Sequence, residues 1–125
     1  MIIPDLINIG LSEQGNDNLD YLKELDYFAE KIDAYRFAVA MAIAAGVIPP
    51  EISKRVTFLN VGSFDPDQAF KKAVEMLLSQ HILETTPYRL IERLADWGVK
   101  KLVEEAKLGR IDFEELIDRL SVLEV

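Results

Sequence analysis

The chain of 125 residues has no cysteine, one histidine and one tryptophan. Without cysteine it can form no disulfide, no thiolate zinc site, no iron–sulfur cluster and no thiol nucleophile. The one imidazole, that of His81, offers none of the ligand clustering that a metal site needs, so we predict no metal, no cofactor and no catalytic residue. We expect His81 to lie near a helix end, where a histidine suits the negative end of the helix dipole.

Basic residues are also scarce, because 14 Lys and Arg stand against 22 Asp and Glu, for a net charge of -8. Nonspecific binding of nucleic acid needs clustered Lys and Arg, so this composition excludes a broad basic footprint. The acidity is concentrated in residues 1–35, whereas residues 36–55 are locally basic. This distribution still permits a weak, local nucleic-acid contact through Arg36, Lys54 and Arg55, together with Lys71 and Lys72.

No apolar run is long enough to cross a membrane. The longest, residues 37–48, has twelve residues, whereas a transmembrane helix needs about 20. The first residues lack the basic and apolar segments of a secretory signal, and the acidic balance disfavours anionic membrane surfaces. We therefore expect a cytoplasmic protein that makes no membrane contact.

The chain does contain enough apolar material for a core. Half of its residues are hydrophobic and 29% are charged, which is typical of folded proteins rather than disordered ones. At this length one domain is expected. We predict a single domain over residues 1–125, with a strand–helix–helix oligomerisation part at 1–48 and a helical part at 65–125.

The pattern of apolar residues predicts a mainly α fold, with a short N-terminal strand followed by four or five helices. Apolar and polar residues alternate over residues 6–12, as in a half-buried strand. Leucines at helical spacing predict a helix from about 18 to 29, and a second helix follows from 33 to 45. The same residues also permit one unbroken helix from 18 to 45. Gly46 ends this region.

The next helix is expected to begin at two carboxylates. Residues 55–61 predict a short strand or an extended edge, and Asp65 then resembles a helix N-cap. Asp65 and Asp67 could act together as general acid and base or bind a hard cation. Helix capping explains both without any chemistry, and we favour it. The helix should run to about residue 79 or 81.

Two further helices complete the chain. Thr86 and Pro87 predict a helix that continues to about residue 108 and contains Gly98 as a point of tight packing or a small kink. Alternating charges over residues 92–105 indicate a solvated face. A last helix should begin after Asp112, which resembles the first residue of a capping box.

Residues 34–45 are the most informative about architecture, because Arg36 is the only charge among them. A helix that is apolar nearly all round has no solvent face and must be buried on several sides. Small alanines permit close approach of another helix, so we predict burial against a second copy in a homo-oligomer. Arg36 should pair with an acid nearby in sequence or in the second copy. The predicted oligomer interface comprises Phe37, Ala38, Ala40, Met41, Ala42 and Ala44.

The strand–helix–break–helix order over residues 6–45 resembles a ribbon-helix-helix unit. In that family two chains pair their strands and interlock their second helices, so the resemblance implies an interlocked homodimer. It also implies that Asn8, Gly10 and Ser12 face outward, where the DNA-reading residues of the family lie. The layout is similar, distantly, to the small E subunit of bacterial DNA sulfur-modification systems, a self-associating protein linked to DNA.

Three functions follow from these observations. We predict a non-enzymatic assembly or interaction protein that acts through self-association and a protein partner, because the sequence holds no catalytic constellation. The alternative is a DNA-associated accessory or regulatory protein of ribbon-helix-helix type. The second alternative is a small-molecule binder or enzyme with a pocket near Trp97, lined also by Tyr88 and Arg89. The candidate residues for ligand or nucleic acid are Arg36, Lys54, Arg55 and Arg89.

Overall fold

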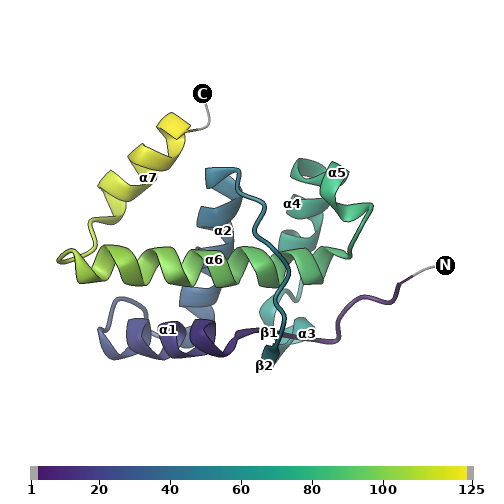
Figure 1. Cartoon of the computed structure of the whole chain (residues 1–125), viewed down its shortest axis with the longest axis horizontal. Coiled ribbons are helices and arrows are strands. Elements are labelled where there is room, and N and C mark those ends of the chain that lie inside the picture. The colour runs from purple at the N-terminus through teal and green to yellow at the C-terminus, as the bar shows by residue number, and fades with distance from the viewer. Residues whose placement is uncertain (1–2, 124–125) are drawn as a thin grey trace.

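The computed structural model describes residues 3–123. These residues form a mainly helical fold with a two-stranded antiparallel sheet near the N-terminus (Figure 1). The elements in chain order are β1 (Asn8–Ser12), α1 (Glu13–Glu24), α2 (Lys31–Ala45), β2 (Arg55–Asn60), α3 (Val61–Phe64), α4 (Ala69–Leu77), α5 (Ser79–Ile82), α6 (Pro87–Lys107) and α7 (Phe113–Leu123).

The predicted mainly α class and the N-terminal strand are confirmed. The described residues form seven helices, whereas four or five were expected. The two extra helices, α3 and α5, have four residues each. One helical turn is too short to show a hydrophobic period, so a pattern of spacing cannot reveal it.

The α2 and α6 helices cross at the centre of the fold. Figure 1 shows α2 running behind α6, with α4 on one side of it and α7 on the other. At the crossing Gly98 of α6 meets Ala38 of α2, because a Cβ atom built on Gly98 would lie 2.3 Å from the carbonyl oxygen of Ala38. The tight packing predicted at Gly98 is therefore confirmed. The predicted parts 1–48 and 65–125 share one core through this crossing.

The α2 helix is buried mostly by its own chain. Ala38 and Ala42 are fully buried against the rest of the core, and Met41 is only 4% exposed. Ala38 and Ala42 are therefore covered within the same chain, and at Ala38 this cover is Gly98 of α6. The other three lie on the side of α2 that is partly or fully exposed: Phe37, Ala40 and Ala44.

The β1 and β2 strands form the sheet although α1 and α2 separate them in sequence. They pair antiparallel, with Asn8 opposite Asn60 and Ser12 opposite Arg55, and the register shifts next to Gly10. A Cβ atom on Gly10 would lie 2.1 Å from the carbonyl oxygen of Val56, so only glycine allows the strands to approach this closely. The strand predicted over residues 55–61 is confirmed, and β1 pairs with a strand of its own chain.

The first helix begins earlier than the leucine pattern suggested. Ser12 caps α1, because its hydroxyl oxygen accepts a hydrogen bond from the N–H of Gly15 at 2.9 Å. The helix therefore starts at Glu13 within a stretch that looks turn-rich in sequence. It ends before Asp26, whose φ of 60° is incompatible with a continuous helix. This break excludes the single helix from 18 to 45.

The two carboxylates bind the first turn of the next helix as expected, but the N-cap residue is Gln68 and the prediction of Asp65 at that position is wrong. Asp65 is 3% exposed and accepts hydrogen bonds from the N–H groups of Phe70 and Lys71, each at 3.0 Å. Asp67 accepts one from Ala69 at 3.1 Å. The helix that they cap begins at Ala69, a few residues later than expected, and is divided into α4 and α5.

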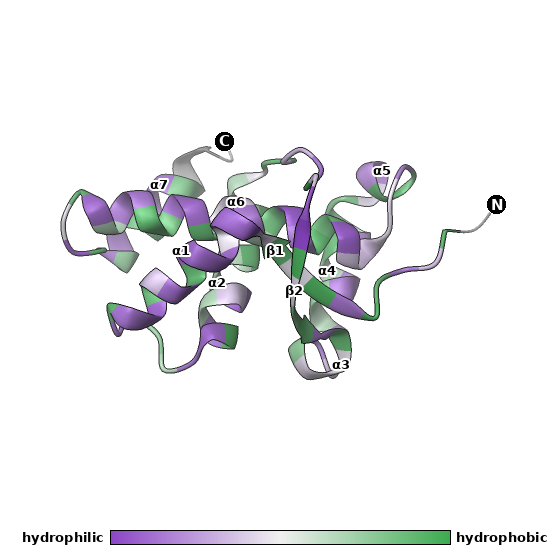
Figure 2. Cartoon of the chain, turned by 60° about the horizontal axis from the view of Figure 1, so that its bottom comes forward, coloured by the Kyte–Doolittle hydropathy of each residue, from purple (hydrophilic) through white to green (hydrophobic). Residues whose placement is uncertain are grey.

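The remaining helix boundaries agree with the sequence. The α6 helix starts at Pro87 directly after Thr86, and the carboxylate of Asp112 accepts a hydrogen bond from the N–H of Glu115 at the start of α7. His81 lies exposed in the last turn of α5, as predicted. Figure 2 shows hydrophilic and hydrophobic residues alternating along α1, α6 and α7. None of the described helices combines the length and apolar character that a membrane span requires.

Candidate functional site

A buried carboxylate joins the sheet to α6. Glu92 is 3% exposed, and its Oε2 atom accepts a hydrogen bond from the N–H of Gly10 at 2.6 Å. The Nε atom of Arg55 lies 3.0 Å from each carboxylate oxygen of Glu92, and its Nη2 atom donates to the carbonyl of Asn8 at 2.7 Å. The prediction of a solvated face fails at Glu92, because Arg55 and the strand supply the partners that its buried charge requires.

Asp96 and Tyr35 extend this network along β1. One carboxylate oxygen of Asp96 accepts hydrogen bonds from the N–H of Ser12 at 3.0 Å and from its hydroxyl at 2.8 Å. The hydroxyl of Tyr35 donates to the carbonyl of Gly10 at 2.9 Å. Burial raises the pKa of Tyr35 well above its usual value, and the nearby carboxylates of Glu92 and Asp96 raise it further. Each of these groups binds the backbone or side chain of β1 and holds the strand in place.

The candidate Arg36 holds a different part of the chain. Its Nε and Nη2 atoms donate to the carbonyl of Phe64 at 3.1 and 3.0 Å, and Nη2 also donates to that of Ser63 at 3.2 Å. These are carbonyls at the end of α3, which has no further turn to satisfy them. Among the described residues Arg36 forms no ion pair, so within the chain these backbone oxygens take the place of the expected acid, and an acid partner in a second copy stays a prediction.

The basic candidates do not form one surface. Arg36 binds beyond the C-terminal end of β2, whereas Lys54 and Arg55 lie at its N-terminal end. Arg89 lies on the first turn of α6, where its Nη1 atom donates to the carbonyl of Pro4 at 2.6 Å, and it lines the same cavity as Arg55. The structure therefore separates Arg36 from Lys54 and Arg55, although the sequence places the three in one basic stretch.

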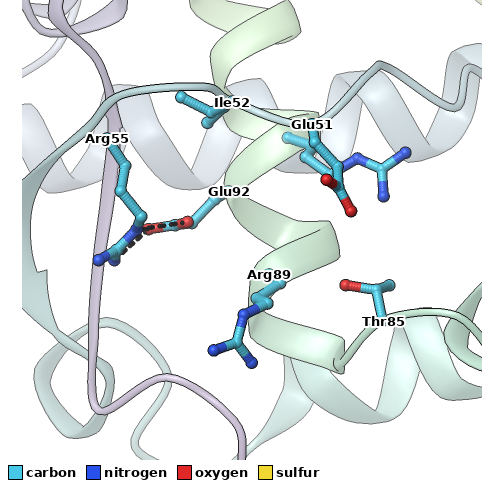
Figure 3. Close-up of a pocket in the computed structure, with 7 residues that line it drawn as sticks. Glu51, Ile52, Arg55, Thr85, Arg89 and Glu92 are labelled. Atoms are coloured by element: carbon cyan, nitrogen blue, oxygen red, sulfur yellow. Dashed lines mark hydrogen bonds and ion pairs between the residues drawn. The ribbon is translucent and has the colours of Figure 1, made fainter. Parts of the chain in front are cut away.

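A cavity of about 180 Å³ lies between α6 and residues 51–55 (Figure 3). In Figure 3 the guanidinium of Arg55 turns to Glu92, whereas that of Arg89 points away from both. Arg93 donates through Nε to the carbonyl of Pro49 at 2.8 Å. Each arginine is thus tethered to its own partner, and the three do not converge on one point. The residues that line the cavity are Glu51, Ile52, Arg55, Thr85, Arg89, Glu92 and Arg93.

A second cavity, of about 310 Å³, contains the only tryptophan. Trp97 lines it together with Asp96 and Lys100. The predicted pocket of Trp97, Tyr88 and Arg89 does not exist in this form. Arg89 lines the smaller cavity, and the hydroxyl of the buried Tyr88 donates to Asp65 at 2.9 Å.

An apolar groove runs along the side of α2 that faces away from α6. Cavities of about 260 and 220 Å³ lie on either side of Ala40, with α4 as one wall and α7 as the other. This arrangement follows from Figure 1, in which these helices flank α2. We call it the α2 groove, and its lining is entirely apolar: Phe37, Ala40, Met41, Ile43, Ala44, Ala69, Phe70, Ala73, Ile117 and Leu120.

The sequence predicted only part of this groove. Four of the predicted interface residues line it, which are Phe37, Ala40, Met41 and Ala44. Its walls on α4 and α7 were missed. The only available signal was the apolar stripe of each helix, and a stripe does not tell which other helix it will face.

Comparisons with known proteins add nothing to this geometry, since the chain matches no family model, no curated protein and no solved structure. In the described part of the chain no three His, Asp or Glu side chains gather to hold a metal. Two kinds of surface on the molecule bear on its function, the polar cavities beside α6 and the α2 groove.

Proposed function

We propose that this protein is a non-enzymatic assembly protein that acts by self-association through the α2 groove. The observation that carries the proposal is an apolar groove that is open to solvent and walled by two helices. Contiguous apolar surface of this kind is typical of interaction sites, because soluble monomers expose little of it. Its burial removes apolar area from water at roughly 25 cal/mol per Å².

The polar cavities support this choice by contrast. Their arginines donate hydrogen bonds to the carbonyls of Pro4, Asn8 and Pro49, so these side chains hold the backbone in place. A binding site for a small molecule needs a few polar groups aimed at one point. The α2 groove needs only an apolar occupant, and a second copy of the chain supplies one. The additional protein partner expected from the sequence stays a prediction.

Ala40 allows a direct test, because it is exposed at the centre of the groove while its neighbours in α2 are buried. Ala40→Glu should leave the fold intact and reduce self-association at least tenfold, since the carboxylate would be desolvated in the contact. Ala29→Glu is the matched control, because Ala29 is exposed in the turn before α2. Sedimentation equilibrium with circular dichroism measures both properties.

The same experiment separates folding from assembly. Ala42→Glu buries a charge in the core and should unfold the chain, unlike Ala40→Glu. A wild-type protein that sediments as a monomer at high micromolar concentration would contradict the proposal. So would an Ala40→Glu variant that associates as tightly as Ala29→Glu.

A further inference from the structure

We infer that the occupant of the α2 groove is the α4 helix of a second copy, in a two-fold arrangement in which each copy gives one helix and one groove. This inference rests on the proposed self-association and goes beyond it, because it specifies which surfaces meet. It starts from an apolar ridge on α4 that lies beside the groove.

The α4 ridge is a row of apolar residues at helical spacing. Met76 is 79% exposed and Leu77 is 65% exposed. They follow Ala69 and Ala73 by three to eight positions, so all four lie on one side of the helix. Two large neighbouring side chains this exposed form a projecting apolar surface, which self-association would remove from water.

The groove has the complementary shape. Its floor includes Ala40 and Ala44, which are one helical turn apart and leave room above α2 for larger side chains. Because ridge and groove lie side by side on each copy, a two-fold axis between α2 and α4 places each ridge in the other groove. Such a contact is closed and self-complementary, as in most homodimers.

Charges at the edges agree with this arrangement. With α4 in the groove of the second copy, its outer edge lies beside α7 of that copy. On α4 this edge carries Lys72, four residues before Met76. On α7 the exposed edge next to Ile117 carries Glu114 and Asp118. Opposite charges therefore meet at both edges, which fixes orientation between two acidic chains.

Cross-linking tests the inference cleanly, because the chain has no cysteine of its own. The two variants are Ala40→Cys and Met76→Cys, each purified alone and then mixed. A short bis-maleimide should join the mixed pair at least tenfold faster than it joins Ala40→Cys to itself, since Ala40 faces α4 of the second copy. Mixing Ala40→Cys with Leu108→Cys is the control, because Leu108 is at least as exposed as Met76 but lies at the far end of α6.

The outcomes distinguish this inference from the proposed function. If Ala40→Glu abolishes assembly but the mixed pair reacts no faster than the control, self-association stands and the α4 arrangement is wrong. Preferential joining of Ala40→Cys to itself would also overturn it, because two α2 helices would then face each other. If no variant cross-links and the wild type is monomeric, both proposals fail.

Discussion

At the scale of single residues, the fold depends on the hydrogen bonds made to the backbone of one glycine, Gly10. Gly10 has no side chain, yet its N–H is bound by Glu92 and its carbonyl by Tyr35. Glu92 and Tyr35 are both buried, and leaving the polar group of either without a hydrogen-bond partner would destabilise the fold. The register of the strands shifts beside Gly10, and α6 and α2 supply hydrogen bonds to its N–H and carbonyl through Glu92 and Tyr35. The sheet is therefore held by side chains of α2 and α6 in addition to strand pairing.

Tyr35→Phe should reveal this dependence in two ways. At pH 7 it leaves the carbonyl of Gly10 without its partner and should lower the free energy of unfolding by about 1–3 kcal/mol. Above about pH 10 an unfolded tyrosine loses its proton, while the raised pKa keeps folded Tyr35 protonated. Wild-type stability therefore falls as pH rises through this range.

The Tyr35→Phe variant lacks this proton release. Its free energy of unfolding should therefore fall less steeply above pH 10 than that of the wild type, with a slope smaller by about 1.4 kcal/mol per pH unit. Tyr88 also has a raised pKa, chiefly from burial and then from its hydrogen bond to Asp65, so part of the slope remains. Urea unfolding from pH 7 to 11 measures both effects. Parallel curves for the two proteins would show that Tyr35 does not cause the alkaline loss.

At the scale of elements, the crossing of α2 and α6 determines the layout. Alanines on α2 and Gly98 on α6 let the two backbones approach closely, and the other helices pack around this pair. One side of α2 packs against α6 at the crossing, and the small residues on the opposite side form the floor of the α2 groove. The same alanine-rich sequence thus serves the core on one side and a surface on the other.

Gly98→Ala should destabilise the protein, although alanine is the better helix former by about 1 kcal/mol. Its Cβ atom would overlap the carbonyl of Ala38, and relieving such overpacking costs about 1–3 kcal/mol. Gly62→Ala is the matched control, because its Cβ atom would meet only the side chain of Asn60, at 3.5 Å. In thermal unfolding, the melting temperature of Gly98→Ala should lie below that of the wild type, and that of Gly62→Ala should lie at or above it. Equal melting temperatures would contradict the tight crossing.

These elements show what the sequence can predict. Local signals were sufficient where one residue acts on its own helix, as with Pro87 at the start of α6 and Asp112 before α7. They failed where the partner is distant. Glu92 looked solvated because the strand that buries it lies 82 residues away, and Arg36 looked like half of an ion pair because its carbonyl partners lie in α3. For the same reason the sequence predicted the α2 residues of the groove but not its walls on α4 and α7. The ribbon-helix-helix resemblance stays a prediction.

At the scale of the whole molecule, charge governs how two copies approach. A net charge of -8 on each copy opposes association, and this repulsion acts over a Debye length of about 8 Å at physiological salt. Most orientations therefore bring acid against acid. The arrangement proposed above offers a local exception, where Lys72 of one copy meets the acidic edge of α7 on the other.

Lys72→Glu should therefore weaken self-association roughly tenfold, because it replaces attraction by repulsion at both symmetric edges. Adding Asp118→Lys to the same chain should recover most of the lost affinity, since a negative charge on α4 then faces a positive charge on α7 of the other copy. Lys107→Glu is the control, because it makes the same change of net charge in the last turn of α6, away from the groove. Sedimentation equilibrium at 0.15 M salt gives the Kd of each variant. If Lys107→Glu weakens assembly as much as Lys72→Glu, only the total charge matters and the contact between α4 and α7 does not form.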